Sequence, residues 1–388
     1  MLVLNEDQVM LKDAAAGFLA SRATLSHLRT LRDASERAGD GSGDAADRGF
    51  DTAVWREMVD MGWAGIAIPE AYGGLGYGYT GLGLVLEQMG RNLSASPLES
   101  SVLVAATALG ELGTQAQKEQ WLPAIAAGEK ILTLALQETA HHAPLRTALQ
   151  ASRAGDRYVL EGSKRFVTDA HVADAFMVIA RTEGRAGAEH GLGAFLVEAN
   201  APGVRIERST MVDSRNAGWL TLHDVHVAPA GVLGEVGTAW PGLSRTLDIV
   251  NIGVSSMLLG LATEAFERTV AYLGERKQFG RVIGSFQGLQ HRAAHLFAEL
   301  ELARSIVLQA LQAVEAGDAE LPLLASAAKA KLCEVATLST NEAIQMHGGI
   351  GMTDEHDIGF FIKRARVLQQ QFGDYHYHLD RYARLSGF

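Results

Sequence analysis

Two segments in the last third of the chain carry residue types that bind a pyrophosphate. One is Arg276-Lys-Gln-Phe-Gly280, and the other runs from Gln345 through Gly348 and Gly349 to Glu355. Paired glycines let a backbone turn approach a pyrophosphate closely, a helix-entry amide can donate to it, and an arginine supplies a bidentate cation. A chance run of glycines on a helical background would give a similar pattern, but the two segments together favour a phosphate site.

Pairs of histidines raise a second kind of chemistry, which is metal binding. His291 and His295 are four residues apart on a predicted helix, but no zinc-peptidase carboxylate-histidine motif accompanies them. His376 and His378 alternate near Asp374, where a solvated or capping role is more common than metal ligation. We therefore predict no metal site, and a packing or surface role for His291 and His295.

The composition argues against several classes of partner. The net charge is −11, with acidic and basic residues interspersed, so neither nucleic acid nor an anionic membrane surface has compositional support. No stretch approaches about 18 uninterrupted apolar residues, and the first residues lack the pattern of a targeting signal. We expect a cytoplasmic protein without a membrane segment, in which the single cysteine, Cys333, is a buried packing thiol.

The elements that must position these residues change along the chain. Up to about residue 130 apolar residues recur every three or four positions, as at Leu82, Val85, Leu86 and Met89, which predicts amphipathic helices. A glycine-rich turn at 69–76 and Pro97 interrupt this pattern. We therefore predict a helical first domain at residues 1–130.

Strands and then long helices follow. The segments 158–162, 175–180 and 220–227 are rich in β-branched and apolar residues between turn residues, which predicts a β domain at 131–236 rather than alternating βαβ units. After Trp240, helical patterns return at 289–313 and 323–346, which predicts a buried bundle at 237–388. Residues 41–47 are the best candidate for a flexible loop.

Helices, then strands, then helices, taken with the motifs, resemble the acyl-CoA dehydrogenase family across essentially the whole chain. In the first domain the glycine turn at 69–76, followed by Glu87 and Gly90, is similar to the family's signature, although an ordinary turn before a helix would look alike. The resemblance implies an α+β fold with an N-terminal helical domain, a middle β-barrel-like domain and a C-terminal four-helix bundle. It also implies FAD shared with a neighbouring subunit, and hence an oligomer, usually a tetramer.

The resemblance assigns cofactor contacts to particular residues. Phe166 and Thr168 stand where the family has an aromatic residue and a threonine against the flavin ring, since an aromatic can cover the ring while a hydroxyl bonds near N5. A plain strand would explain the same alternation. The contacts that the resemblance implies are Gln137, Phe166, Thr168, Arg276, Gln278, Phe279, Gln287, Gln345, Gly348, Gly349 and Asp374.

The family's reaction needs a carboxylate to take an α-proton from an acyl-CoA thioester. In this sequence the usual base position falls on Phe372 and the alternative position on Val250, and neither side chain can accept a proton. Asp374 is the best remaining candidate for the catalytic base, with a flavin contact or a helix cap as the competing interpretation. The family's thioester-oxygen donor is a backbone amide, which Phe372 retains.

A second departure concerns the loop that helps the family hold acyl-CoA and the flavin. Residues 137–144, with His142 and Pro144, replace the family's Gly-x-Gly-Ser-Asp loop. Bulkier and stiffer residues change the shape and hydrogen bonding of such a loop. We therefore expect altered acyl-CoA binding.

Three functions are consistent with this sequence. The first is FAD-dependent α,β-dehydrogenation of an acyl-CoA thioester, with electron-transfer flavoprotein as the acceptor that the family implies. The second is a base-deficient subunit of a heteromeric acyl-CoA dehydrogenase, acting on a steroid side chain or another unusual acyl group. The third is a flavin monooxygenase on the same fold, which needs no α-proton base.

Overall fold

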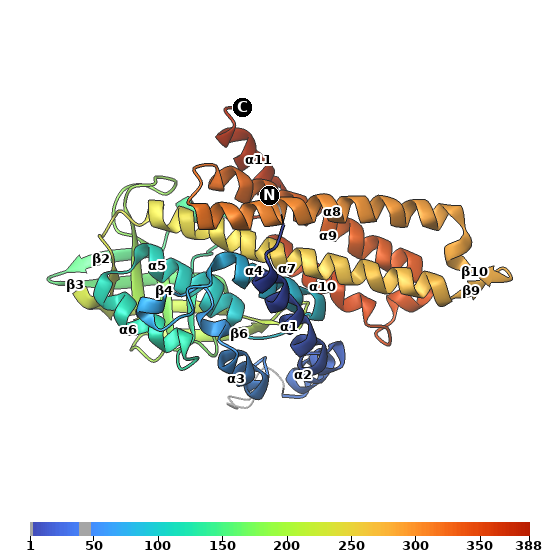
Figure 1. Cartoon of the computed structure of the whole chain (residues 1–388). Helices are drawn as coiled ribbons and strands as arrows, with labels where there is room; N and C mark the ends of the chain where they lie inside the picture. Colours follow the sequence, from blue (N-terminus) through green and yellow to red (C-terminus); the bar gives the residue numbers. More distant parts are fainter. Residues whose placement is uncertain (1–2, 39–47) are drawn as a thin grey trace. The chain divides into compact units, whose positions relative to one another are not determined.

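The computed structural model describes residues 3–38 and 48–388, which form two compact units (Figure 1). The first unit comprises the chain up to Arg29 together with Tyr79–Ser94 and Asn251–Phe388, and the second comprises Thr30–Gly78 and Ala95–Val250. The loop predicted at 41–47 lies outside the described residues. The predicted order of helices, strands and helices is observed.

The first unit is helical. Three helices, α2, α4 and α7, have residues in both units. The helices with residues in this unit are α1 (Glu6–Arg22), α2 (Leu25–Ala38), α4 (Gly78–Asn92), α7 (Trp240–Glu275), α8 (Gln287–Ala316), α9 (Leu321–His347), α10 (Ile358–Gln370) and α11 (Tyr375–Leu385). Short elements join them: the hairpin β9 (Lys277–Gln278) and β10 (Arg281–Val282), with η6 (Ile283–Ser285) and η7 (Gly348–Met352).

Two glycines bring α4 and α7 into backbone contact. A Cβ atom at Gly90 would collide with the carbonyl oxygen of Met257, and one at Gly260 would collide with that of Glu87. The buried carboxylate of Glu87 also accepts from Lys12 at 2.9 Å and from Arg304 at 3.2 Å. The Glu87 and Gly90 of the sequence signature therefore join α1, α4, α7 and α8 into one helical core.

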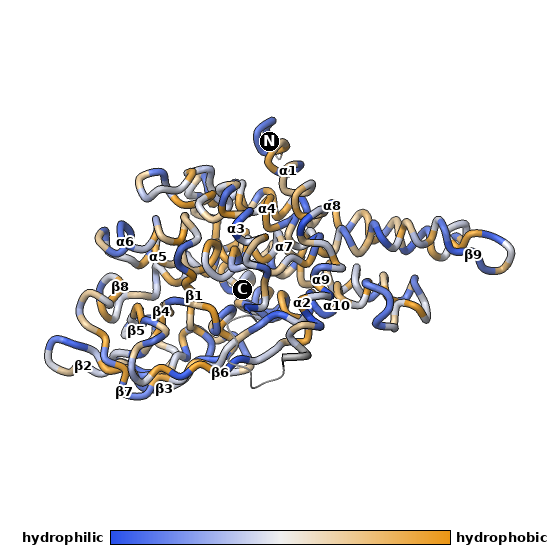
Figure 2. The backbone as a smooth tube through the Cα atoms, turned by 90° about the horizontal axis from the view of Figure 1, so that it is seen from below, coloured by the Kyte–Doolittle hydropathy of each residue, from blue (hydrophilic) through white to orange (hydrophobic). Residues whose placement is uncertain are grey.

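Among the described helices, α7 is long and apolar enough to cross a membrane by length and composition, although 89% of its most apolar window is buried within the protein. Hydrophobic residues line much of this helix in Figure 2. A buried core helix passes the same test, because its apolar residues face other helices instead of lipid. The apolar composition of α7 is therefore explained by its packing against other helices.

The second unit combines short helices with a mixed sheet. Its helices are α3 (Thr52–Asp60), η1 (Trp63–Gly65), η2 (Glu70–Tyr72), the π-helix η3 (Leu98–Ala106), α5 (Thr107–Leu112), α6 (Gln115–Ala126), η4 (Pro144–Arg146) and η5 (Pro229–Gly231). Its strands are β1 (Leu132–Ala135), β2 (Gln150–Ala154), β3 (Arg157–Thr168), β4 (Ala175–Arg181), β5 (Leu192–Glu198), β6 (Val204–Thr210), β7 (Asn216–Val227) and β8 (Val232–Leu233). The three predicted strands correspond to β3, β4 and β7.

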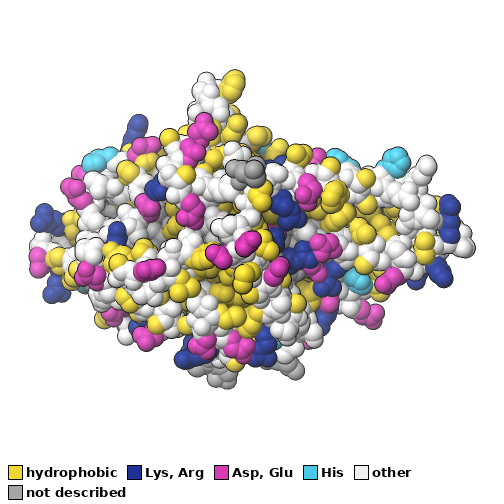
Figure 3. Space-filling model, in the orientation of Figure 1, with side chains coloured by type: hydrophobic (Ala, Val, Ile, Leu, Met, Phe, Trp, Pro, Cys, Tyr) yellow, Lys and Arg dark blue, Asp and Glu magenta, His cyan; other side chains and the backbone are white. Residues whose placement is uncertain are grey.

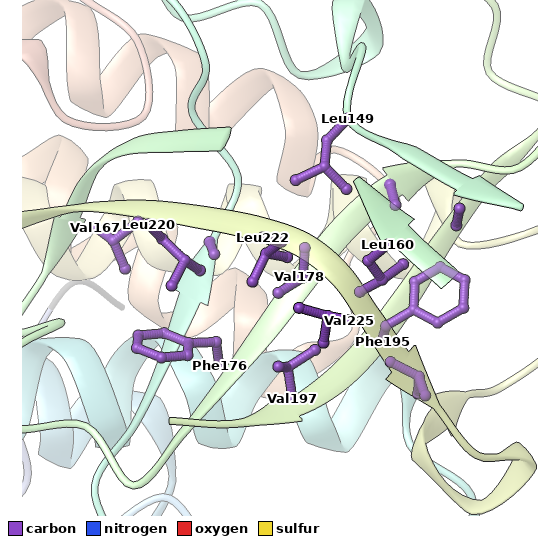
Figure 4. Close-up of a cluster of buried hydrophobic side chains, with 14 of the residues drawn as sticks. Leu149, Leu160, Val167, Phe176, Val178, Phe195, Val197, Leu220, Leu222 and Val225 are labelled. Atoms are coloured by element: carbon purple, nitrogen blue, oxygen red, sulfur yellow. The ribbon is translucent and has the colours of Figure 1, made fainter. Parts of the chain in front are cut away.

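The sheet has the order β6-β7-β3-β2-β4-β5-β8, and β1 pairs with β4 in parallel. The strands β3 and β7 form its longest antiparallel ladder, interrupted by two bulges. Alternate residues of the strands point into one apolar core, which Figure 4 shows around Phe176, Phe195 and Leu222. This core fixes the register of β3, because a one-residue slip would turn its apolar side chains to the other face.

Candidate active site

The structure brings the two predicted phosphate-binding segments together at one end of the helices of the first unit. Tyr272 near the end of α7 stacks on His347 at the end of α9, with ring centroids 4.4 Å apart. Arg292 in α8 donates to Glu342 in α9 at 2.5 Å. The end of α9, with Gln345, Gly348 and Gly349, therefore lies beside the connection from α7 to α8.

The glycine pair has room beside its backbone. Gly348 has φ 66° and ψ −142°, a conformation that favours glycine. Gly349 does not have a positive φ, and a Cβ atom built on either residue meets no atom within 4 Å. A ligand could therefore approach the backbone of both glycines closely. This feature fits the pyrophosphate of FAD.

The position of the glycine pair decides which helix amides could face a phosphate. The glycine pair follows the carboxyl end of α9, where the helix dipole is negative, and so it does not offer the amides of a long helix's entry. Two helices begin at this end without a side-chain cap: α8 at Gln287, and α10 at Ile358, just after His356, whose ring lies 4.7 Å from that of His347. Arg276 and Gln287 have exposed side chains, as Gln345 has. A favourable helix dipole for a phosphate at this end can therefore come from α8 or α10, and a positive charge from side chains such as Arg276.

The hairpin β9–β10 presents an aromatic and basic tip. Phe279 has φ 56° and is 90% exposed, and its ring meets Phe286 edge to face at 6.1 Å. Arg281 lies over the Phe286 ring at 4.1 Å, and the Gln278 side chain is exposed beside them. Figure 3 shows Lys and Arg side chains at this end of the molecule. Such a tip suits contact with an anionic or aromatic group.

In the second unit the structure places Gln137, Phe166 and Thr168 close together. The Arg165 amide donates to the Gln137 carbonyl oxygen at 2.7 Å, and the Thr133 hydroxyl donates to the Thr168 carbonyl oxygen at 2.9 Å. The β3–β7 ladder shifts register between Lys164 and Val167, and within this bulge Phe166 has φ 52° and is 51% exposed. A bulge re-aims a side chain, and here it turns an aromatic ring outward.

A buried ion pair that sequence reasoning missed anchors this turn. Asp169, with φ 55°, accepts from Arg215 at 3.3 Å and from the Ser100 hydroxyl of η3 at 2.7 Å. Burial acts to lower the pKa of Arg215, but Asp169, Glu99 and Asp213 outweigh it and raise that pKa. No sequence signal joins these residues, because Ser100 and Arg215 are 69 and 46 residues from Asp169.

The substituted loop at 137–144 is held by a second buried pair. Glu138 accepts from the backbone amides of Ala148 and Leu149 at 2.7 and 3.0 Å, and from the Lys164 ammonium at 2.6 Å. The Lys164 side chain is fully buried, and this burial lowers its pKa from 10.5 to about 8 despite the attraction of Glu138. The loop is therefore ordered by a charge pair rather than by glycine turns.

The segment that carries the family's usual base is a tightly held turn. Phe372 has φ 54°, and its carbonyl oxygen lies 3.3 Å from the side-chain Nδ2 of Asn251 and 3.1 Å from His378 Nε2. The buried ammonium of Lys329 donates to the carbonyl oxygens on both sides, at 2.6 Å to Gln371 and 2.8 Å to Gly373. Sequence reasoning did not identify Lys329, which resembles any lysine of an Ala/Lys-rich helix.

The capping role proposed for Asp374 is confirmed. Asp374 is the N-cap of α11, and its carboxylate accepts from the Tyr377 amide at 2.9 Å. Val250, at the other base position, is fully buried. The side chains at both expected base positions are thus apolar, and the carboxylate of Asp374 has a structural partner. Its assignment as a base or flavin contact stays a prediction.

The predictions for the remaining polar residues have mixed outcomes. His291, His295 and His376 are exposed, and Cys333 is buried, as predicted. The prediction of a solvated or capping role was wrong for His378, which is buried because the turn before α11 folds over it and uses its ring nitrogen. Within residues 3–38 and 48–388 no group of three potential ligands could hold a metal ion.

Comparison with known proteins identifies the family of this fold. Residues 5–129, 137–225 and 240–386 match the N-terminal, middle and C-terminal domains of acyl-CoA dehydrogenases, respectively. The chain belongs to the acyl-CoA dehydrogenase family. The predicted α+β fold is thereby confirmed, and the protein is an oxidoreductase of a family whose members are FAD-dependent.

Relatives and solved structures agree with this acyl-CoA dehydrogenase assignment. The short/branched chain specific acyl-CoA dehydrogenase of Bos taurus mitochondria is 31% identical over 329 residues, which are 83% of this chain and 75% of that protein. A steroid ACAD described as Tcur3481-Tcur3483 has a TM-score of 0.85 and 31% identity, with 98% of each chain covered. The ChsE4-ChsE5 complex of Mycobacterium tuberculosis has a TM-score of 0.87 and 26% identity, covering 100% of this chain and 99% of that one.

Proposed function

We propose that this chain is the base-deficient subunit of a heteromeric, FAD-dependent acyl-CoA dehydrogenase that introduces an α,β-double bond into an acyl-CoA thioester. The observation that carries the proposal is the pair of apolar residues at the base positions, Phe372 and Val250, together with the use of Asp374 as a helix cap. An α-proton must go to a base held within hydrogen-bond reach, so a carboxylate on another chain is required.

The division of labour follows from the residues that this chain keeps. FAD, when bound, supplies the acceptor for the hydride that leaves the β-carbon. Phe166 and Thr168 would lie against the flavin ring, while Arg276, Gln287 and Gly349 would hold the ADP half. The chain therefore contributes cofactor-binding surface, and the partner contributes the carboxylate that takes the α-proton.

Two of the solved structures support a heteromer. Tcur3481-Tcur3483 and ChsE4-ChsE5 are each described by two different chain names, and the first is called a steroid ACAD. Their similarity to this chain motivates the proposal of a tetramer of unlike chains that acts on a steroid side chain or another unusual acyl group. Electron-transfer flavoprotein remains the acceptor that we propose.

The first test uses the chain purified alone. FAD per chain is measured from absorbance, and a panel of acyl-CoA thioesters is added without oxygen while flavin bleaching is followed. We expect substoichiometric FAD, or FAD that stays oxidised with every thioester. Stoichiometric FAD that bleaches would contradict the proposal, and loss of that bleaching in Asp374→Asn would then assign the base to Asp374.

The second test uses a partner chain of the same fold that carries a carboxylate at either base position. Co-expression should give a stable complex with bleaching that neither chain shows alone. Replacing the partner's carboxylate by its amide should remove bleaching, whereas Asp374→Asn in this chain should not. Product hydroxylation with rapid oxygen uptake would instead support a monooxygenase.

A further inference from the structure

Lys329 occupies an unusual position for a lysine. Its side chain is fully buried in α9, and both hydrogen bonds found for its ammonium go to backbone carbonyl oxygens, those of Gln371 and Gly373. Burying an ammonium group is unfavourable unless the charge is paired or hydrogen-bonded. A methionine or leucine would fill the same space without that penalty, so the charge itself calls for an explanation.

The carbonyl of Gln371 and the amide N–H of Phe372 belong to one peptide group. A cation that bonds to the oxygen of a peptide withdraws electron density from it, and so it strengthens the N–H of the same group as a donor. The 2.6 Å contact from Lys329 to the Gln371 oxygen is short enough for a strong charge-assisted bond. The Phe372 N–H is therefore a polarised donor.

Among the described residues, the Phe372 N–H donates no backbone hydrogen bond. A free backbone donor at a half-buried residue is unusual in a folded protein, since such groups are nearly always paired. An acceptor from outside the chain would complete it.

The same turn is fixed from other sides. The Phe372 carbonyl oxygen is bound by the Asn251 side chain and by the His378 ring, and Asp374 begins α11 immediately afterwards. Phe372 itself is held at φ 54°, which is unfavourable for a phenylalanine and persists only when the surroundings impose it. The direction of the Phe372 N–H is therefore set before any ligand arrives.

We propose that Lys329 is a positioning residue that polarises the Gln371–Phe372 peptide, so that the Phe372 N–H binds the thioester carbonyl oxygen of an acyl-CoA. The proposal rests on the proposed function only for the class of ligand. It deepens that function, because a chain without its own base would still bind and polarise an acyl-CoA thioester without oxidising it.

The test measures polarisation of the bound carbonyl directly. Crotonyl-CoA and cinnamoyl-CoA, each with ¹³C at the thioester carbonyl, are added to the purified wild-type protein, and isotope-edited infrared spectra give the carbonyl stretch. We expect a shift to lower frequency on binding to the wild type. In Lys329→Met most of this shift should be lost, and thioester affinity should fall by about tenfold, as for loss of a charge-assisted hydrogen bond.

Two further variants separate polarisation from general loosening of the turn. Asn251→Leu removes a donor from the Phe372 carbonyl but leaves the Gln371–Phe372 peptide with Lys329, and so it should keep most of the shift. Lys329→Gln keeps a neutral donor, and it replaces Lys329→Met if that variant does not fold. We expect Lys329→Gln to show a smaller shift than the wild type.

The proposal is overturned if neither thioester binds, if the bound wild type shows no shift, or if a folded Lys329 variant shows the full shift. An equal loss of shift in Asn251→Leu and the Lys329 variants would also overturn it, because loosening of the turn would then explain both. None of these outcomes bears on the heteromer, which is tested by flavin bleaching with a partner. The two proposals can therefore fail separately.

Discussion

At the scale of single residues, the clearest case is Asp374. Its carboxylate accepts from the Tyr377 amide at the start of α11, so the carboxylate two residues beyond the expected base position already has a backbone partner. A short polar side chain at an N-cap satisfies a donor that the helix leaves unpaired. The capping role and a catalytic role make different demands on the side chain, and substitutions can separate them.

The first prediction concerns Asp374. Asp374→Asn should change the free energy of unfolding little, because asparagine is an equally good N-cap, while Asp374→Ala should lower it by about 1 kcal/mol. Urea denaturation of the two variants measures this difference. Equal destabilisation by both substitutions would show that charge rather than capping matters at this position.

Gly349 lies in the segment for which the sequence predicts contact with a pyrophosphate, and a Cβ atom there would have room. Gly349→Ala should leave the free energy of unfolding nearly unchanged, since its Cβ atom meets no atom within 4 Å. It should weaken FAD binding by about tenfold or more, because overpacking costs roughly 1–3 kcal/mol where a ligand approaches closely.

The matched control for this glycine is Gly359→Ala in α10, where an added Cβ atom also meets nothing within 4 Å. This variant should retain FAD affinity, and titration of both variants with FAD gives the comparison. If Gly349→Ala binds FAD like the wild type, the ADP half does not lie against this turn.

At the scale of elements, two buried charge pairs order the loops that border β3. Lys164 and Glu138 hold the segment 137–144, and Arg215 and Asp169 hold the turn after Thr168. Each pair joins residues from different elements, so the loops depend on the sheet for their shape. Both pairs therefore make predictions about stability.

The third prediction is a pH dependence from Lys164, whose pKa burial lowers from 10.5 to about 8. In this range the unfolded chain binds more protons than the folded one, so unfolding free energy should rise as pH increases from 8 to 10.5. Lys164 should add roughly 3 kcal/mol to the unfolding free energy above pH 10.5, relative to its value below pH 8. This gain is lost as the pH falls from 10.5 to about 8, and below pH 8 Lys164 causes no further change. Lys164→Met should lack this rise in denaturant melts; an unchanged pH dependence would refute the assignment.

The fourth prediction concerns the pair beneath Thr168. Arg215→Met leaves the carboxylate of Asp169 buried without its cation, which should lower the unfolding free energy by about 3–5 kcal/mol. Adding Asp169→Asn should recover part of the loss, because the uncompensated charge is then gone. Denaturation of the single and double variants gives the coupling, and simple additivity would mean that the two groups do not interact.

At the scale of the whole molecule, the hairpin β9–β10 is the element that joins α7 to α8 and carries an exposed aromatic tip. Its tip residue Phe279 is 90% exposed, so this ring contributes little to packing within the chain. The family resemblance implies that this segment contacts a flavin shared with a neighbouring subunit. A residue that acts in the assembly should affect cofactor content without affecting the stability of the chain.

The fifth prediction follows from this exposure. Phe279→Ser should leave the free energy of unfolding of the isolated chain within about 0.5 kcal/mol of the wild type, as for most surface substitutions. In the assembled complex it should lower the FAD bound per chain. The control is Phe388→Ser, since Phe388 is 95% exposed and lies outside the hairpin. Equal FAD content in both variants would remove the hairpin from the cofactor site.

The sequence by itself determined the order of helices and strands, the family, and the apolar residues at the two expected base positions. All three follow from local patterns or from counting along one segment, as from Gln345 to Phe372. Such patterns can be recognised without knowing how the chain folds. The capping role of Asp374 was also accessible, because an N-cap is a contact over three residues.

Only the tertiary structure decided how buried charges are used. Lys329 lies 42 and 44 residues from its two carbonyl partners, and Arg215 lies 46 residues from Asp169. Whether a lysine points into water or into a turn depends on which helix faces pack together, and a helical repeat gives every lysine the same local environment. The use of the Asp374 carboxylate as a helix cap was therefore predictable from the sequence. The contact of Lys329 with the Gln371–Phe372 peptide was not.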